Sequence, residues 1–242
     1  MTGGPTGLVL AAGTGSRLAS IGASKPLVPV CGRPLIHHVI ESLRDAGIVS
    51  VTLVLGHRAA QMQAALDDFD PGIPLSTLFN PEFLKPNGWS ALAAKGHVAA
   101  PFVLSMSDHI YEPLLVRRLL ARPLALGEAR LAVDKRRDNP LVDMDDVTRV
   151  LEEDGHISDI GKGIAAWNAF DTGVFYAGES LFAALAEDAQ AGSEVSLSAA
   201  MRRLAKKGLA TTADIGDAFW IDVDDPAALA RAEAAMPGRL AS

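Results

Sequence analysis

Cysteine is nearly absent from this sequence, since Cys31 is the only one in 242 residues. An intrachain disulfide and a cysteine-based zinc cluster are therefore both excluded, and this usage fits a reducing cytoplasm. The first residues lack the basic segment and the apolar core of about 7–15 residues that a signal peptide needs. No segment reaches the ~18 uninterrupted apolar residues of a transmembrane helix. We therefore expect a soluble, cytoplasmic protein without stable membrane insertion.

Dense runs of lysine and arginine are also missing. The formal net charge is −7, whereas a protein that binds nucleic acid needs a basic patch to meet the phosphates. We therefore expect no nucleic-acid partner. The six histidines show no metal-ligand spacing, so they predict no histidine-based metal centre.

A glycine-rich loop directly follows the first apolar run of the chain. The backbone N–H groups of such a loop can approach phosphate oxygens closely, and Arg17 and Lys25 supply the positive charge that pyrophosphate needs as it leaves. A Walker A motif would need Gly-Lys-Ser/Thr, and a dinucleotide fingerprint would need glycine where Leu18 stands. The loop therefore predicts a triphosphate site, with an ordinary glycine-rich turn as the alternative. Its residues run Leu8-Val9-Leu10-Ala11-Ala12-Gly13-Thr14-Gly15-Ser16-Arg17-Leu18 and continue to Ser24-Lys25-Pro26-Leu27.

Strand-like runs alternate with helix-like segments in the first half, which predicts a parallel sheet covered on both faces. A helix led by Pro34 should stop at Gly47. The right-handed crossover rule then favours a doubly wound, Rossmann-like sheet. The expected strands are Val51–Leu55, Leu75–Phe79 and Phe102–Met106, and the further helices are Ala59–Leu66, Trp89–Val98 and Pro113–Leu120.

The second half changes character and begins with a predicted β-hairpin. Its strands Thr148–Glu152 and His156–Ile160 are joined by Asp154-Gly155, a pair typical of a type I′ turn. The fold class is therefore α/β, a doubly wound mixed sheet with a small β-hairpin insertion. Without an internal repeat or a long linker, residues 1–242 should form one domain. The remaining expected elements are strands Thr172–Tyr176 and Phe219–Val223, and helices Leu181–Glu187, Leu197–Lys206 and Pro226–Ala235.

Two aspartates are candidate metal ligands because they follow strand-like runs. In an open parallel sheet, ligands bind beyond the carboxyl ends of the strands, and Mg²⁺ prefers carboxylate oxygens. Asp108 is the first candidate, with a helix cap as its alternative. Asp222 is the natural second ligand, although Asp224 could serve instead. Asp225 is expected to cap the last helix, and His109 to contact a ligand or to orient its loop.

The whole pattern resembles the nucleotidyltransferases that join a nucleoside triphosphate to a phosphorylated sugar or polyol. The glycine-rich loop with its Lys-Pro-Leu carries this resemblance, as does the late element Trp220–Pro226, which has one additional residue before its proline. In that superfamily the late element usually carries the second metal-binding aspartate. Three middle elements look like inositol-1-phosphate cytidylyltransferases, namely Asn80-Pro81-Glu82, Asn87-Gly88-Trp89-Ser90 and Ser107-Asp108-His109.

The resemblance implies transfer of a cytidylyl group from CTP to inositol 1-phosphate, giving CDP-inositol and pyrophosphate, with Mg²⁺ as cofactor. Asp108 and Asp222 would hold the metal, Lys162 the acceptor phosphate, and the hairpin would lie over the acceptor site. The implied catalytic residues are Arg17, Lys25, Asp108 and Lys162; the nucleotide-binding residues are Leu10, Ala11, Ala12, Gly13, Gly15, Asn87, Gly88 and Ser90; the acceptor-binding residues are Asp134, Asp171 and Thr172.

Several of these residues also have purely structural interpretations. Asn87 can bond a pyrimidine edge and Gly88 can leave room for a base, but an Asn-Gly pair is also a common turn. Lys162 is equally expected on a surface, and the acceptor carboxylates can close a strand end. The acidic stretch Asp143–Asp146 fits a solvated face or a flap over the acceptor.

Two other functions stay open at this point. An enzyme of the same superfamily that uses another acceptor, such as phosphocholine or a hexose 1-phosphate, or a purine triphosphate, would need the same loop. A choline group would need an aromatic cage. The three tryptophans are scattered along the sequence, which favours a polyol acceptor. A nucleotide-binding regulator that has lost turnover is the other alternative. Some members of the family carry a fused membrane domain, so a separate membrane CDP-alcohol phosphotransferase is the expected user of the product.

Overall fold

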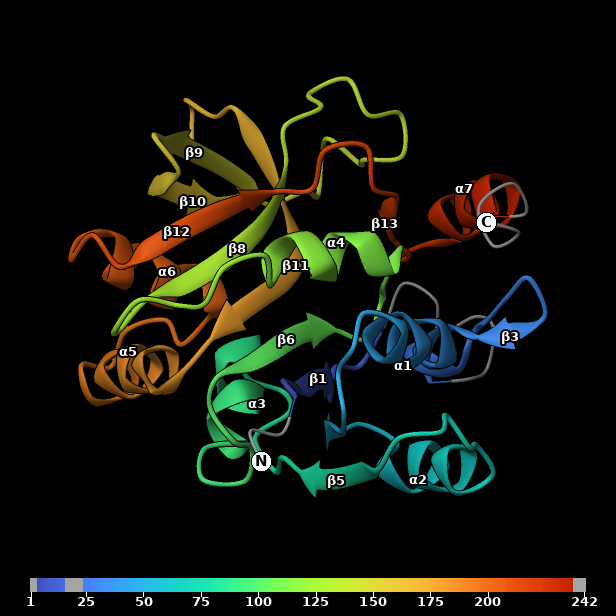
Figure 1. The fold of residues 1–242 in the computed structure, drawn as a ribbon. Coiled ribbons are helices and arrows are strands. Elements are labelled where there is room, and N and C mark those ends of the chain that lie inside the picture. Colours follow the sequence, from blue (N-terminus) through green and yellow to red (C-terminus); the bar gives the residue numbers. More distant parts are fainter. Residues whose placement is uncertain (1–3, 16–23, 237–242) are drawn as a thin grey trace.

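A nine-stranded mixed sheet forms the centre of the protein (Figure 1). The computed structural model describes residues 4–15 and 24–236. The strands of this sheet are β1 (Thr6–Ala11), β4 (Val51–Leu55), β5 (Leu75–Phe79), β6 (Phe102–Met106), β8 (Ala129–Asp134), β9 (Arg149–Glu153), β10 (His156–Gly161), β11 (Ala169–Ala177) and β12 (Ala210–Asp214). Their order is β5-β4-β1-β6-β11-β8-β12-β10-β9. The first four run parallel, as predicted, and β11 is antiparallel to both β6 and β8.

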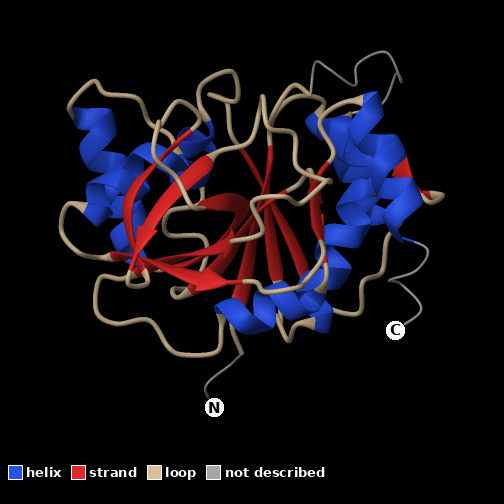
Figure 2. Ribbon diagram, turned by 90° about the horizontal axis from the view of Figure 1, so that it is seen from above, coloured by secondary structure: helices blue, strands red, loops and turns tan. Residues whose placement is uncertain are grey.

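Helices cover both faces of the sheet (Figure 2). They are α1 (Leu35–Asp45), α2 (Ala59–Asp67), α3 (Asn87–Ala93), α4 (Pro113–Leu119), α5 (Glu179–Gln190) and α6 (Leu197–Ala205). Along β1, Val9 and Ala11 face one core while Leu8 and Leu10 face the other, because successive side chains of a strand point to opposite faces. The first core packs against α1, α2 and α4, and the second against α3, α5 and α6.

The predicted hairpin belongs to the main sheet. β9 pairs with β10 and also with β11, so that β11, β8, β12, β10 and β9 close into a barrel-like ring. The turn has the predicted form, with φ of 50° at Asp154 and 78° at Gly155. The expectation of a small insertion on a doubly wound sheet is therefore corrected. β11 is longer than predicted, and it reaches β9 through Ala169 and Phe170.

Two three-residue strands bring distant parts of the chain together. β7 (His109–Tyr111) and β13 (Trp220–Asp222) pair antiparallel, and Asp222 lies opposite His109. Next comes α7 (Pro226–Ala235), whose N-cap is Asp225 as predicted, since its carboxylate accepts a hydrogen bond from the Ala228 N–H at 2.7 Å. The remaining short elements are η2 (Lys25–Leu27), β2 (Pro29–Val30) and β3 (Arg33–Pro34).

Most predicted elements are present; the differences are the ends of some elements and several strands that were not predicted. α3 ends at Ala93, before Gly96, whose φ of 81° does not suit a helix. β7, β8 and β12 were not predicted; β8 and β12 are alanine-containing and pair only inside the closed ring. None of the helices described combines the length and apolar character needed to cross a membrane.

Candidate active site

Two adjoining cavities open near the carboxyl ends of β1 and β6, where an α/β sheet normally binds ligands. The first, which we call the loop-side cavity, measures about 290 Å³ and is bordered by the glycine-rich loop and Lys25. The second, the β11-side cavity, measures about 220 Å³ and is bordered by β11, β13 and part of the loop 135–148. Five residues line both: Met106, Asp108, Asp146, Lys162 and Asp224. The two cavities are therefore contiguous.

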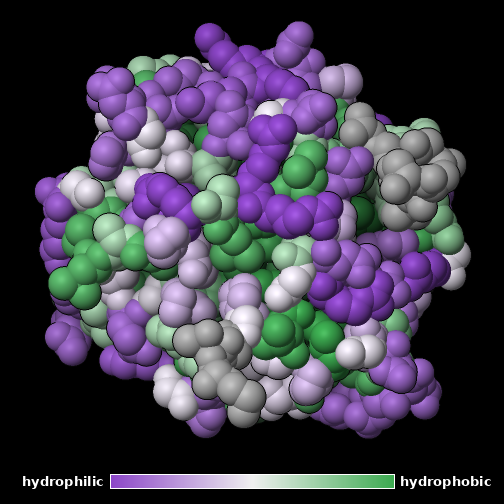
Figure 3. Space-filling view, viewed as in Figure 1, coloured by the Kyte–Doolittle hydropathy of each residue, from purple (hydrophilic) through white to green (hydrophobic). Residues whose placement is uncertain are grey.

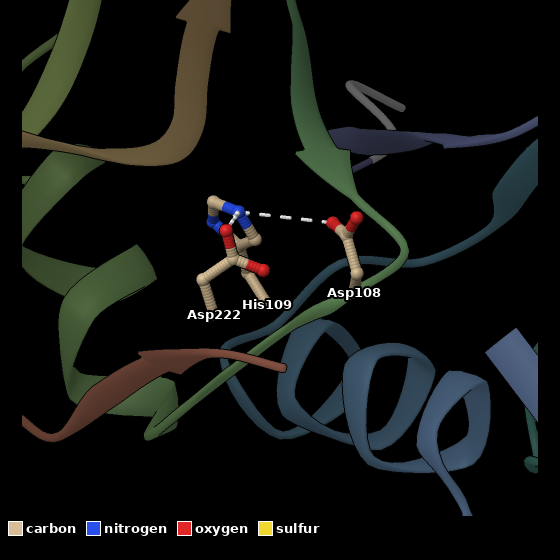
Figure 4. A group of neighbouring side chains, drawn as sticks. All are labelled: Asp108, His109 and Asp222. Carbon is tan, nitrogen blue, oxygen red and sulfur yellow. Dashed lines mark ion pairs between the residues drawn. The ribbon is translucent and has the colours of Figure 1, made fainter. Parts of the chain in front are cut away.

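An acidic group lies at the junction of these cavities (Figure 4). Asp108 stands just after β6, while His109 and Asp222 face each other across the β7–β13 pair. The Nε2 atom of His109 lies 3.4 Å from Asp222 Oδ2 and 3.7 Å from Asp108 Oδ1. Sequence reasoning singled out both aspartates, and the short β7–β13 pairing is what brings them together.

The charges in this group are balanced by two cations. The buried Lys25 ammonium lies 2.6 Å from Asp108 Oδ2, also contacts Asp224, and lies 3.9 Å from Asp222 Oδ1. Burial works to raise the pKa of Asp108, but Lys25 and His109 outweigh it and hold this pKa below its usual range. Burial likewise opposes the charge on His109, but the carboxylates of Asp222 and Asp108 raise its pKa to about 9.

Two carboxylate oxygens in the group have an ion-pair partner at 3.7–3.9 Å but accept no hydrogen bond from the described residues. Asp108 Oδ1 and Asp222 Oδ1 are buried, and neither has a hydrogen-bond partner in the described parts of the chain. An unpaired buried polar atom costs on the order of 1–3 kcal/mol, so such atoms call for an explanation, for example a ligand or ion. Their chemistry suits Mg²⁺, which prefers carboxylate oxygens. Asp224, the alternative second ligand, is also a partner of Lys25 and lines both cavities.

Lys162 lies between the two cavities, at the end of the β9–β10 hairpin. Its ammonium is paired with Asp146 from the loop 135–148. That loop contributes Leu141–Asp143 and Asp146–Thr148 to the β11-side cavity. Hydrophilic side chains dominate the outer surface in this region, at the top of Figure 3 over β9 and the loop. The acidic stretch predicted as a flap therefore does border the second cavity.

The three predicted acceptor-binding residues divide into one that lines a cavity and two that do not. Asp171 lines the β11-side cavity, where burial raises the pKa of its carboxyl to about 6 although the Gly173 N–H donates to Oδ1. Asp134 and Thr172 line neither cavity, because both side chains are fully buried and hydrogen-bonded within the protein, and their contact with the acceptor stays a prediction. Asp134 accepts bonds from Arg136, Asn139 and Trp220, and the Thr172 hydroxyl donates to the Ala132 carbonyl.

Of the predicted residues of the glycine-rich loop, some line a cavity and others are buried in the core. Leu10, Gly13 and Gly15 line the loop-side cavity, whereas Ala11 and Ala12 are buried in the two cores. Gly15 has a φ of 57°, and a Cβ there would lie 2.3 Å from the Cβ of Lys25. The glycine therefore makes room for the lysine. Arg17 lies outside the described residues.

The Asn-Gly-Trp-Ser element has clear packing roles. Asn87 lines the β11-side cavity, yet its Oδ1 accepts a hydrogen bond from the Leu197 N–H at 3.0 Å, at the start of α6. Gly88 packs so closely that a Cβ would lie 2.5 Å from the Val195 carbonyl oxygen. The Ser90 hydroxyl accepts a bond from the Asn80 amide at 3.0 Å. These contacts account for all three residues, and their contact with a nucleotide stays a prediction.

This chain is similar to known proteins in three respects: a family model, curated relatives and solved structures. The family model of the MobA-like NTP transferase domain matches residues 7–203. Two relatives are named bifunctional IPC transferase and DIPP synthase: that of Rubrobacter xylanophilus is 35% identical and covers 97% of this chain and 52% of its own length, and that of Aquifex aeolicus is 31% identical and covers 91% and 49%. The chain thus spans about half the length of these relatives.

The solved structure of the inositol-1-phosphate CTP transferase from T. maritima is similar along most of both chains. It has a TM-score of 0.82 and 28% sequence identity, and the match covers 93% of this chain and 91% of that one. A UDP-glucose pyrophosphorylase complexed with UDP-glucose reaches a TM-score of 0.80 at 17% identity. At that level of identity the second similarity concerns the fold alone.

Proposed function

The chain belongs to the MobA-like NTP transferase domain family, and we propose that it transfers a cytidylyl group from CTP to inositol 1-phosphate. Membership of this family confirms the resemblance to nucleotidyltransferases that the glycine-rich loop carries. The relatives named IPC transferase and inositol-1-phosphate CTP transferase support the choice of substrates. The observation that carries the proposal is the pair of buried carboxylate oxygens, Asp108 Oδ1 and Asp222 Oδ1, which accept no hydrogen bond from the described residues and lie where two cavities meet.

The loop-side cavity is the proposed triphosphate site. The backbone of Gly13 and Gly15 borders it, so N–H groups can approach phosphate oxygens there. Lys25, together with Arg17, would stabilise the charge that develops on pyrophosphate. Mg²⁺ held by Asp108 and Asp222 would supply further positive charge against the triphosphate.

The β11-side cavity is the proposed acceptor site. Lys162 lines both cavities, so its ammonium is well situated to hold the acceptor phosphate beside the triphosphate. Asp171, which lines the same cavity, is the carboxylate that we assign to the polyol hydroxyls. We do not assign Asp134 and Thr172 to the acceptor, since both side chains are hydrogen-bonded within the protein.

The reaction needs positioning and charge neutralisation more than proton transfer. A phosphate oxygen of the acceptor forms a bond to the α-phosphorus of CTP while the bond from that phosphorus to the bridging oxygen of pyrophosphate breaks. The attacking phosphate is already nucleophilic, so no side chain has to remove a proton. Lys162 would hold the attacking phosphate and Lys25 the leaving pyrophosphate near the junction of the two cavities.

The lining of the acceptor cavity disfavours phosphocholine. A quaternary ammonium group binds best inside a cage of aromatic rings. Of the three tryptophans, all in the described part of the chain, only Trp220 lines this cavity, and its indole N–H is bonded to Asp134. The lining is mixed and includes Phe175 and other apolar side chains, but among the described residues it holds no cluster of aromatic rings, and its aspartates suit the hydroxyls of a polyol phosphate better.

Pyrophosphate release from the purified protein with Mg²⁺ tests the proposal. CTP, UTP, GTP and ATP are each combined with inositol 1-phosphate, phosphocholine, glucose 1-phosphate or no acceptor. We expect release only with CTP and inositol 1-phosphate. Release with another pair would correct the substrates and keep the reaction type, whereas silence throughout, together with tight CTP binding, would favour a nucleotide-binding regulator.

The product also suggests a partner. CDP-inositol is an activated alcohol, so the reaction that consumes it transfers its phosphoinositol group to another alcohol. Relatives whose names combine IPC transferase with DIPP synthase support this sequence of reactions. We propose a membrane CDP-alcohol phosphotransferase as the enzyme that uses the product.

A further inference from the structure

We infer that His109 is a positioning residue, which anchors one oxygen of Asp222 so that the other is presented to a divalent cation shared with Asp108. The inference rests on the proposed function, because it concerns the cation that such a reaction uses. Three observations support it: the contact of His109 Nδ1 with the Thr172 carbonyl, the contact of Nε2 with Asp222, and the Oδ1 atoms of Asp108 and Asp222, which accept no hydrogen bond within the described part of the chain.

The back of the ring is fixed to β11. The Nδ1 atom lies 2.6 Å from the Thr172 carbonyl oxygen, and because a carbonyl can only accept, Nδ1 must be the donor. The pairing of β11 with β8 is irregular between Asp171 and Phe175, which is where this carbonyl projects. Thr172 therefore contacts His109 through its backbone carbonyl, while its buried hydroxyl bonds to Ala132.

Gly173 leaves the space that the ring occupies. Its φ is 73°, and a Cβ built there would lie 2.3 Å from Nδ1 and 2.5 Å from Cε1 of His109. Its N–H donates to Asp171 Oδ1 at 2.7 Å, which stabilises the local turn. A side chain at this position would push the imidazole forward, so the glycine sets the depth at which the ring lies.

The front of the ring faces the two carboxylates. Nε2 lies 3.4 Å from Asp222 Oδ2 and 3.7 Å from Asp108 Oδ1 (Figure 4). Asp222 is thus anchored through Oδ2 by His109, and Asp108 through Oδ2 by Lys25 at 2.6 Å. In each carboxylate the other oxygen, Oδ1, is the buried atom without a hydrogen-bond partner among the described residues.

This division of oxygens is typical of metal sites, where ligating carboxylates are themselves held by hydrogen bonds. Losing such an outer partner typically costs about 10- to 100-fold in metal affinity or activity. His109 is better suited to this role than to binding the cation, because Mg²⁺ prefers oxygen ligands and both ring nitrogens face acceptor oxygens.

Titration of Mn²⁺ into the protein holding CTP without acceptor tests this inference directly. His109→Ala should weaken Mn²⁺ binding by about 10- to 100-fold, and His109→Gln, which keeps an amide donor, should recover part of the loss. Gly173→Ala should weaken binding as well, although it removes no polar group. Matched controls are Gly208→Ala, at an exposed glycine with a similar φ of 69° and open space for a Cβ, and the exposed His156→Gln; both should bind Mn²⁺ like the wild type.

Kinetics and unfolding separate positioning from general damage. In the His109 variants the Mg²⁺ concentration for half-maximal rate should rise, while the KM for the acceptor and the melting temperature stay near wild type. Unchanged Mn²⁺ affinity in His109→Ala would overturn the inference, as would a loss that follows the melting temperature. If the wild type neither binds Mn²⁺ with CTP nor releases pyrophosphate, the proposed function fails as well.

Discussion

Two acidic clusters in this protein, a buried one around Glu128 and a partly exposed one around Asp108, differ in how completely their hydrogen bonds are made. At the start of β8, Glu128 accepts bonds from both Arg122 nitrogens at 2.7 and 2.8 Å, from Arg130 at 2.9 Å, from the Ala125 N–H at 2.7 Å and from Thr211. Arg130 in turn donates to three backbone carbonyls. At the junction of the cavities, by contrast, Asp108 and Asp222 each keep one buried oxygen without a hydrogen-bond partner in the described structure.

A low pKa does not distinguish the two clusters, because cations depress it in both. Burial opposes ionisation of Glu128, but its arginine and threonine partners lower the pKa to about 2, and Lys25 lowers that of Asp108. The unused hydrogen-bonding capacity does distinguish them. A cluster in which every carboxylate oxygen accepts a hydrogen bond stabilises the fold. A cluster in which buried oxygens accept none can still bind a ligand.

The largest effect is expected from a substitution in the cluster of Asp108 and Asp222. Asp108→Asn should reduce the rate of pyrophosphate release by about 10³-fold, because a neutral amide is a weaker ligand for the cation and no longer balances Lys25. Asp217→Asn, at an exposed aspartate, is the control. Full activity of Asp108→Asn would contradict the metal site, and a large drop in melting temperature would make Asp108 a structural residue like Glu128.

A substitution in the Glu128 cluster should lower stability without lowering activity. Glu128→Gln should lower the free energy of unfolding by about 3 kcal/mol, because the buried Arg130 loses its charged partner, while kcat/KM stays at the wild-type value. Urea unfolding measures the loss, with Glu187→Gln at an exposed carboxylate as the control. Altered kcat/KM with unchanged stability would reverse the assignment.

The pH dependence follows from the sign of the shift at Glu128. A carboxyl whose pKa is lower in the folded protein stabilises it above the unfolded pKa, near 4.5, and that contribution is lost as the pH falls toward about 2. The difference in stability between wild type and Glu128→Gln should therefore be largest near neutral pH and shrink on acidification.

The smallest expected effect concerns an ion pair that borders both cavities. Lys162 is exposed, and exposed pairs such as Lys162–Asp146 contribute only about 0–1 kcal/mol to stability. Lys162→Met should therefore unfold like the wild type but lower kcat/KM for the acceptor by about 10- to 100-fold, the value of a charged hydrogen bond. Lys206→Met, at an exposed lysine outside the cavities, should change neither. Unchanged kcat/KM would remove Lys162 from the acceptor site.

The parallel half of the fold was predictable because its signals are local. The runs Val51–Leu55, Leu75–Phe79 and Phe102–Met106 have the predicted bounds, as does the helix Pro226–Ala235 with its Asp225 cap. The closed ring was not predicted, because it depends on pairings such as β9 with β11 that no local pattern reveals.

The sequence by itself determined the family, the glycine-rich loop and the two candidate metal ligands, since each rests on residue types in a fixed order or on a position just after a strand. It could not separate Asp171 from Asp134, because no local pattern reveals whether a carboxylate near a strand end meets a cavity or internal hydrogen-bond donors. Only the tertiary structure decided that Asp171 lines a cavity while Asp134 is saturated with hydrogen bonds. It also decided that Gly173 makes room for His109, because such contacts depend on how distant strands pack.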